Sequence, residues 1–323
     1  MKDKKFDFRK LIFKFLFSLL LCIIVTSLIF LLNDIYKILD ILFYINKLDI
    51  LILISFSLGI YFGRFMKWCI FLTSLNIKIP LKENIKIFLS GLSMGLTPGK
   101  LGEVLKAYIL KQKYNIDFSI TSPTIIAERL TGVIGCFILC LISMIILNKG
   151  NIYSYIFTIL FITLLIFVII LLNSPKFVNY LFNRIIKIKI CSNKMSIIKN
   201  FYNGLINLLD KKIFIITIFI SVAYWSLECG LFYFILKIFD VNIDMINSVF
   251  IISGISILGG LSFMPGSIGA LEGGLIGSLI YKGIDFSLAS GMTLLHRFFA
   301  MWIIIIIGGI ILLLNIKNFK LYK

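Results

Sequence analysis

Six apolar runs are each long enough to cross a lipid bilayer as a helix, and this feature decides the fold class. We predict membrane spans at about residues 11–32, 48–72, 120–147, 152–173, 213–236 and 286–315. A helix needs roughly 20 residues to cross the hydrocarbon core, where every backbone polar group must be bonded within the segment. A composition of 60% hydrophobic and 15% charged residues also excludes an ordinary soluble domain. The sequence therefore predicts an all-α polytopic membrane protein.

Two further apolar stretches, residues 84–112 and 245–282, are interrupted at their centres by glycine and proline. Each is too short for two full spans and a loop. We therefore predict that each forms a re-entrant hairpin, or a pair of broken helices, that enters and leaves the membrane on one side. Non-helical backbone at membrane depth has to be buried in protein or line a polar cavity. The residues expected to break the hairpins are Pro98, Gly99, Gly102, Pro265, Gly266 and Gly269.

The distribution of basic residues predicts the orientation of the spans. With a cytoplasmic N-terminus, most of the 33 Lys and Arg residues fall on inner segments, and we include Arg64 and Lys67 among them. The outer segments then hold Lys37, Lys47, Lys149, Lys237 and Lys282. Cytoplasmic loops accumulate basic residues, so we predict a multi-pass protein of the cell membrane with both termini in the cytoplasm. The net charge of +18 fits this bias, and it does not indicate nucleic-acid binding because no basic stripe lies on a soluble domain.

One extramembrane segment of the predicted topology is sizeable, the basic loop at residues 174–212. It mixes basic and apolar residues, which fits either an amphipathic helix bound to anionic headgroups or a solvated linker. The six cysteines form no CxxC pair and the chain has one histidine. The sequence thus predicts no metal site and no cofactor.

The two broken stretches share a pattern that indicates an internal repeat. In both, a Pro-Gly pair is followed by a glycine and a glutamate, and an arginine lies 31 or 32 residues beyond the proline. We predict one membrane domain, residues 1–323, with repeat units at about 48–147 and 213–315 and a linker span and basic loop at 148–212. Because three spans separate equivalent points, the second unit is inverted. The hairpins should then enter from opposite faces and meet near the midplane, as in many secondary transporters.

Charged residues inside the predicted membrane segments form the candidate site, because a charge in hydrocarbon is costly unless it is paired or lines a polar cavity. They are Glu103, Glu128, Arg129, Glu228, Glu272, His296 and Arg297. Arg129 and Arg297 are the predicted anion ligands, since a guanidinium binds phosphate or carboxylate through two parallel hydrogen bonds. The alternative is that each arginine pairs with Glu103 or Glu272 and locks its hairpin in place.

The remaining candidates are open to more than one interpretation. Glu103 and Glu272 are candidates for carrying a coupling proton, because burial disfavours a charged carboxylate. Glu228 has no counterpart in the repeat and fits a local pair or a cavity-lining group. His296 is either a proton relay or, as we favour, a polar neighbour of Arg297 that faces the bundle. Lys100 and Lys106 flank the first hairpin, where we expect them to meet headgroups or extend to the surface.

Three motifs resemble a known family. They are TPGKLGEVLKAYIL at 97–110, ERLTGVIG at 128–135 and MPGSIGALEGGL at 264–275, and they resemble the flippase-like membrane domain of lysylphosphatidylglycerol synthases from about residue 10 to 315. That domain also occurs alone. In the synthases it is associated with moving an aminoacylated phospholipid between leaflets, while a cytosolic domain makes the lipid. No segment for such a domain follows the last span here, so the resemblance implies lipid translocation without synthesis.

The sequence thus favours a lipid flippase or transporter, not an enzyme, for an anionic phospholipid or a polyprenyl-linked lipid, with membrane lipids as its partners. One alternative is an accessory membrane subunit of an envelope lipid or glycan pathway. Another is a membrane glycosyltransferase, which would need paired carboxylates or a metal site at the membrane surface. Asp240 and Asp244 lie on a short outer connection, but the loops around them are too short to build a substrate pocket.

Overall fold

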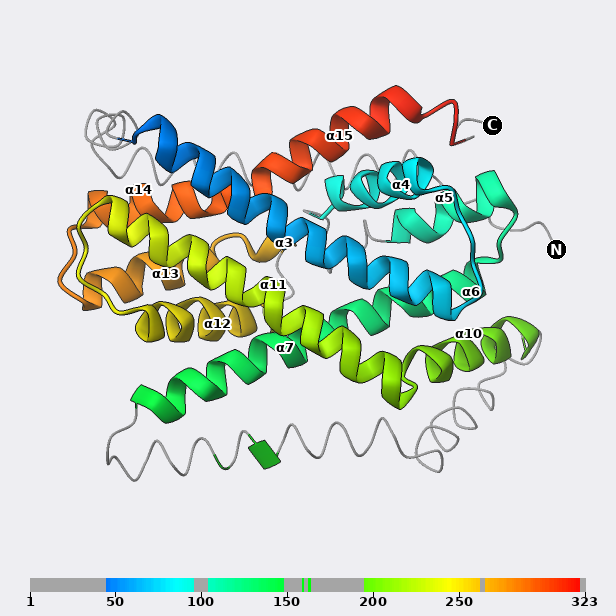
Figure 1. Ribbon diagram of the computed structural model, residues 1–323, viewed down its shortest axis with the longest axis horizontal. Coiled ribbons are helices and arrows are strands. Elements are labelled where there is room, and N and C mark those ends of the chain that lie inside the picture. Colours follow the sequence, from blue (N-terminus) through cyan, green and yellow to red (C-terminus); the bar gives the residue numbers. More distant parts are fainter. Residues whose placement is uncertain are drawn as a thin grey trace.

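The computed structural model describes residues 45–95, 104–147, 159, 162–163, 195–261 and 265–319, and every regular element in these ranges is helical (Figure 1). This confirms the all-α class. The predicted spans at 11–32 and 152–173 are not covered, apart from isolated residues of the second. Five residues of the first hairpin for which we made predictions also lie outside the described ranges: Pro98, Gly99, Lys100, Gly102 and Glu103.

Four helical segments are long and apolar enough to cross a membrane. They are α3 (Lys47–Ser74), α6 with α7 (Phe118–Leu147), α11 (Lys211–Ile238) and α14 with α15 (Phe286–Asn315), and they match four of the predicted spans. Their outward faces are apolar, with Phe219 75% and Leu314 76% exposed. Large exposed apolar side chains are expected where the surrounding solvent is lipid. The described part of the chain is therefore a polytopic membrane protein.

The first hairpin consists of α4 (Leu81–Ser93) and α5 (Val104–Tyr114), and the second of α12 (Met245–Leu261), the short turn η3 (Pro265–Ser267) and α13 (Ala270–Tyr281). The two ends of each hairpin meet. Lys113 Nζ lies 2.5 Å from Glu83 Oε2 in the first, and Lys282 Nζ lies 3.5 Å from Asn247 Oδ1 in the second. Both limbs of a hairpin thus start and finish at the same end of the molecule, as predicted.

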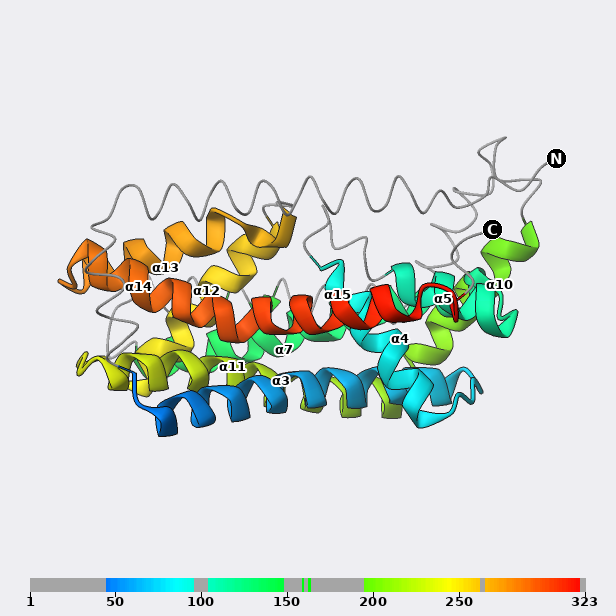
Figure 2. The same cartoon turned by 90° about the horizontal axis from the view of Figure 1, so that it is seen from above.

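The hairpins enter from opposite ends of the molecule. In Figures 1 and 2, α4 and α5 occupy the end that also holds α10, whereas α12 and α13 occupy the other end. The long helices α3 and α11 run past both hairpins and pack against each other. The apolar core accordingly has two main parts. One surrounds α12, α13 and α14, and the other lies between α4, α5 and the ends of α3 and α15.

Hydrogen bonds between the two halves of the chain follow the inverted pattern. Tyr61 and Trp225 occupy the same position in the 28-residue helices α3 and α11, counted from their first residues. The Tyr61 hydroxyl donates to the carbonyl of Ala300 on the last span. Trp225 Nε1 donates to the carbonyl of Gly132 on α7, at 2.9 Å. Each half therefore supports the span that follows the other half's hairpin, although the exact limits of the repeat units stay a prediction.

The last span is divided by a π-helical turn, η4 (Phe298–Trp302), between α14 (Phe286–Arg297) and α15 (Ile303–Asn315). A π-turn shifts the regular helical hydrogen bonds, and α3 meets the altered carbonyls: Ser57 Oγ donates to Phe299 O at 2.8 Å, next to the Tyr61 bond. Beyond the turn, α15 packs on α4, where a Cβ on Gly308 would lie 2.2 Å from the carbonyl oxygen of Leu89. On the other side of the turn, α14 packs on α13. This span therefore contacts both hairpins.

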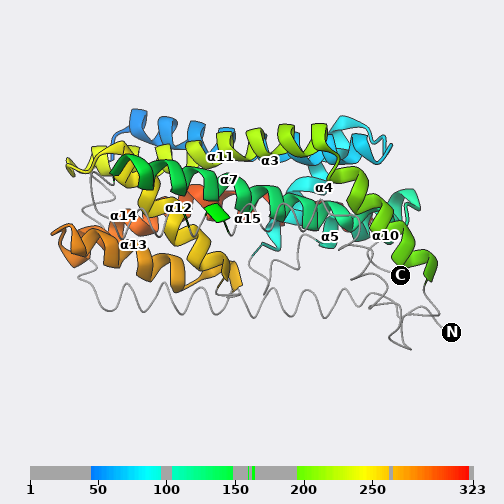
Figure 3. The same ribbon diagram turned by 90° about the horizontal axis from the view of Figure 1, so that it is seen from below.

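The predicted basic loop contains a helix in its second half, α10 (Met195–Leu208), which packs against α6 (Phe118–Thr121) and α7 (Pro123–Leu147). Figure 3 shows α10 near one end of α7. Gly204 allows the approach, because a Cβ there would lie 3.0 Å from Pro123 Cγ. Of the two interpretations of this loop, the helix is confirmed for residues 195–208. Residues 174–194 lie outside the described ranges, and headgroup binding stays a prediction.

Candidate functional site

Arg297 ties the tip of the second hairpin to the last span. Its Nε donates to Glu272 Oε1 at 2.7 Å, and its Nη2 donates to the carbonyl of Gly266 at 2.9 Å. The other carboxylate oxygen, Glu272 Oε2, accepts from the backbone N–H of Gly269 at 2.7 Å and so caps the start of α13. Gly266 and Gly269 have φ values of 58° and 83°, a conformation that glycine adopts without strain. For Arg297, the structure thus shows the predicted lock.

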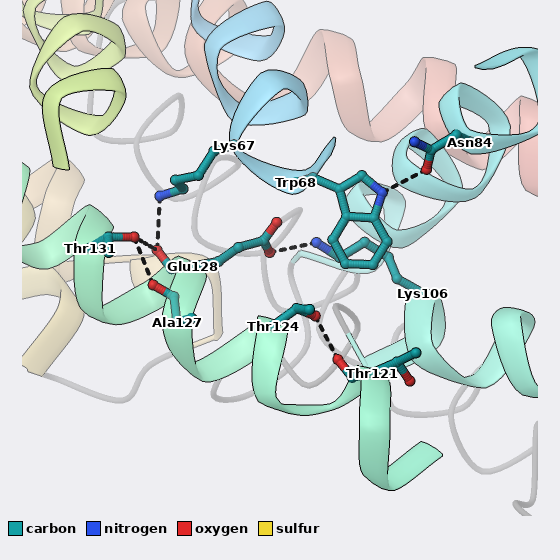
Figure 4. A network of polar contacts seen from close by, with 9 residues as sticks. All are labelled: Lys67, Trp68, Asn84, Lys106, Thr121, Thr124, Ala127, Glu128 and Thr131. Carbon is teal, nitrogen blue, oxygen red and sulfur yellow. Dashed lines mark hydrogen bonds and ion pairs between the residues drawn. The ribbon is translucent and has the colours of Figure 1, made fainter. Parts of the chain in front are cut away.

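The first hairpin is also tied to the next span by a buried ion pair (Figure 4). Lys106 Nζ on α5 lies 2.6 Å from Glu128 Oε2 on α7. The lysine is 1% exposed and lies 4.3 Å from the centre of the Trp68 ring, an attractive cation–π contact. Gly91 makes room for its stem, since a Cβ there would lie 2.3 Å from Lys106 Cγ. The prediction that Lys106 meets headgroups or extends to the surface is therefore wrong, because α4 and α3 enclose it.

The two locks have reversed polarity. In the first, the hairpin supplies the cation and the following span supplies the anion, whereas in the second Glu272 is on the hairpin and Arg297 on the span. Arg129 follows Glu128 on α7 but its side chain is exposed. The structure therefore does not give Arg129 and Arg297 the same surroundings, although their sequence contexts match. The proposed pairing of Arg129 with Glu103 falls partly on residues outside the described ranges.

Two basic residues that the sequence interpretation placed on an inner segment lie within the bundle. Lys67 is 3% exposed, and its Nζ donates to the carbonyl of Glu128 at 2.9 Å and to Ser221 Oγ at 3.0 Å (Figure 4). Arg64 lies one turn earlier, between the rings of Tyr61 and Tyr224, with its guanidinium carbon 5.6 and 5.2 Å from their centres. The count of basic residues did not anticipate this burial: both side chains lie on faces of α3 (Lys47–Ser74) that pack against neighbouring helices. Their assignment to the inner side of the membrane stays a prediction.

A sequence signal for this placement existed. Ser57, Tyr61, Arg64 and Trp68 follow one another at intervals of three or four residues. Such spacing puts polar and amphipathic groups on one face of a helix. A polar face on an otherwise apolar span indicates that this face is turned toward protein.

Glu228 is 7% exposed, and its Oε2 lies 3.6 Å from Arg64 Nη2. The two residues occupy the same position in α11 and α3, counted from Lys211 and Lys47. The prediction that Glu228 has no counterpart in the repeat is therefore wrong: its counterpart is Arg64, a residue of opposite charge. An ion pair between equivalent positions lies where the two related helices cross.

His296 is 1% exposed, and its ring meets the Phe232 ring edge-on with centres 5.6 Å apart. It thus faces the bundle beside Arg297, as the favoured interpretation predicts. Its role as a proton relay stays a prediction.

A family model described as the lysylphosphatidylglycerol synthase TM region matches residues 12–308. The chain belongs to this family. Among similar proteins, a UPF0104 membrane protein of Methanocaldococcus jannaschii is 29% identical over 236 residues, which are 69% of this chain and 94% of that protein. A UPF0104 membrane protein of Pyrococcus horikoshii is 25% identical over 280 residues, 78% of this chain and 82% of that protein. The family connects this membrane protein with lipids.

The motifs that resemble this lysylphosphatidylglycerol synthase region supply three of the four charged residues of the two locks. The stretch 97–110 provides Lys106, and the stretch 128–135 provides Glu128. The stretch 264–275 forms the glycine turn and the start of α13, and it provides Glu272. In this family member, motif residues thus take part in both hairpin contacts, while Arg297 and the Arg64–Glu228 pair lie outside the motifs.

Proposed function

We propose that this protein moves an anionic lipid, a phospholipid or a polyprenyl-linked lipid, between the two leaflets of the membrane. One observation carries the proposal: two broken hairpins enter from opposite ends, and a buried ion pair fastens each to the span that follows it. In secondary transporters with inverted repeats, broken helices build the substrate site, and one repeat rocks against the other. The membership of a lipid-related family supports the same function.

The last span would couple the two hairpins during transport. It is fastened to the second hairpin through Arg297 and packs against the first through Gly308, with the π-turn η4 between these contacts. Such turns are frequent at functional sites. A displacement of one hairpin would therefore reach the other through a single element. The protein acts in this proposal as a transporter and not as an enzyme, because moving a lipid requires no bond to be broken.

Leaflet exchange in proteoliposomes tests the proposal. Headgroup-labelled phosphatidylglycerol and a labelled polyprenyl phosphate would be compared, with and without a proton gradient. We expect intact protein to accelerate exchange of at least one of these lipids. The variant Arg297→Met/Glu272→Gln, which removes both charges of the second lock, should lower the rate at least about tenfold. The control Lys82→Ala changes an exposed residue at the start of α4 and should leave the rate unchanged.

Exchange no faster than in empty vesicles, for both lipids and under both conditions, would refute the proposal. The accessory-subunit hypothesis would then take its place.

A further inference from the structure

Arg64 is accessible in the middle of a buried helix face. On either side of it along this face of α3, the residues are at most 7% exposed: Ser57, Ile60, Tyr61, Lys67, Trp68 and Phe71. The side chain of Arg64 is nevertheless 28% exposed. The guanidinium also lies beside Tyr61, Tyr224 and Glu228, so its accessible part adjoins the contact between α3 and α11.

The contact between Arg64 and Glu228 is long. Their closest nitrogen–oxygen distance is 3.6 Å, whereas charge-assisted hydrogen bonds between these groups are about 2.7–2.9 Å. The lock residues behave differently, since Arg297 and Lys106 reach their carboxylates at 2.7 and 2.6 Å. The guanidinium of Arg64 is thus attracted to the Glu228 carboxylate at a distance longer than a charge-assisted hydrogen bond. A ligand oxygen at hydrogen-bond distance would interact with the guanidinium more strongly than Glu228 does in this geometry.

The position of Arg64 within the fold is the second observation. Arg64 and Glu228 are equivalent residues of α3 and α11, so their pair lies on the approximate two-fold axis that relates the repeats. A point on this axis is equally far from the two ends of the molecule. A headgroup that crosses in either direction would pass it.

The chemistry of the surroundings favours an anion. Tyr61 and Tyr224 hold the guanidinium between their rings, which limits the freedom that it would lose on binding. Lys67 brings a second cation one turn away, and its two hydrogen bonds described above go to neutral oxygens. The planar guanidinium can donate two parallel N–H hydrogen bonds to phosphate oxygens, and the nearby lysine adds a second positive charge.

We propose that Arg64 binds the phosphate of the transported lipid at the midpoint of its path, and that Glu228 competes with the phosphate for the guanidinium. This inference rests on the proposed function and names the substrate group that the site would take. Without lipid, Glu228 balances the charge of Arg64. With lipid, a phosphate monoester or diester takes that place. The phosphate could belong to a lipid headgroup or be free inorganic phosphate, and the experiment separates these sources.

Ligand-dependent thermal stabilisation in a neutral detergent measures the binding. The three probes are dioctanoyl phosphatidylglycerol, dioctanoylglycerol (which lacks the phosphate) and inorganic phosphate. We expect phosphatidylglycerol alone to stabilise the intact protein. Arg64→Gln should weaken its apparent affinity about ten- to a hundredfold, the loss expected for a charged hydrogen-bonding pair. Arg64→Lys, which keeps the charge but not the fork, should fall between.

Two further variants make the result interpretable. Arg64→Gln/Glu228→Gln leaves no unbalanced charge and should fold, yet bind as weakly as Arg64→Gln. Lys237→Gln is the matched control, because Lys237 is an exposed cation 5.5 Å from the Tyr233 ring and should bind like intact protein. If the folded double variant binds phosphatidylglycerol as tightly as intact protein, the inference is overturned. If inorganic phosphate stabilises as well as the lipid, through Arg64, the lipid assignment is overturned.

The same variants separate this inference from the transport proposal. Binding through Arg64 without any lipid exchange in vesicles would uphold the phosphate site and reject transport. Equal exchange rates for intact protein and Arg64→Gln would uphold transport and reject the role of Arg64.

Discussion

The lock of the second hairpin offers a sharp test of how the fold is held together. Arg297 and Glu272 are 5% and 3% exposed, and they join through a 2.7 Å contact. Arg297→Met removes this contact and the bond to the Gly266 carbonyl, and it leaves the carboxylate buried with the Gly269 N–H as its remaining bond among those described. Breaking a buried pair from one side costs about 3–5 kcal/mol. We therefore expect the free energy of unfolding to fall by that amount.

Changing both partners should cost much less than the sum of the two single changes. Arg297→Met/Glu272→Gln has no unbalanced charge, and the new amide oxygen still accepts from the Gly269 N–H. Glu272→Gln alone leaves Arg297 charged and should also cost about 3–5 kcal/mol. A double-mutant cycle isolates the coupling between them, which we expect to be the larger part of each single effect.

Reversible unfolding in mixed micelles, followed by circular dichroism, would give these free energies. Lys86→Met provides the comparison, because its contact with Glu83 is nearly as short, 2.9 Å, but more exposed, and exposed pairs contribute about 0–1 kcal/mol. If Arg297→Met lowers the free energy of unfolding by no more than Lys86→Met does, this ion pair does not hold the second hairpin in place and the reasoning fails.

Two further predictions concern the first hairpin. Gly308→Ala places a Cβ 2.2 Å from the carbonyl oxygen of Leu89 and should lower the unfolding free energy by about 1–3 kcal/mol through overpacking. Gly309→Ala meets nothing within 4 Å and should be neutral or stabilising, so equal losses in the two variants would contradict the close packing of α15 on α4. At the open end of the first hairpin, hydrogen bonds from Lys113 and from Lys86 lower the pKa of Glu83. Because the folded pKa lies below the unfolded value of about 4.3, this stabilisation is complete above that pH and is lost as pH falls through the folded pKa. The stability difference between intact protein and Glu83→Gln, followed by thermal unfolding from pH 7 to pH 3, should shrink accordingly, and a difference that stays constant would argue against the contribution of these contacts.

The sequence by itself determined the four helical spans that the structure describes and the two hairpins. Both follow from local properties. An apolar run of sufficient length must form a helix in lipid, and a Pro-Gly pair inside such a run interrupts it. The matching order of Pro-Gly, glycine and glutamate at residues 98–103 and 265–272 likewise indicates two related units. The lock between Arg297 and Glu272 was one of two interpretations that this local pattern allowed.

The tertiary structure alone decided which charges meet. Arg64 and Glu228 lie far apart in the sequence, and only the crossing of α3 and α11 joins them. The sequence predicts a surface position for Lys106, but in the structure α4 and α3 enclose it and it pairs with Glu128. The physical reason is the same in each case: the cost of a buried charge depends on what faces it across a helix interface. That depends on the rotation and spacing of neighbouring helices, which hydropathy and local motifs do not encode.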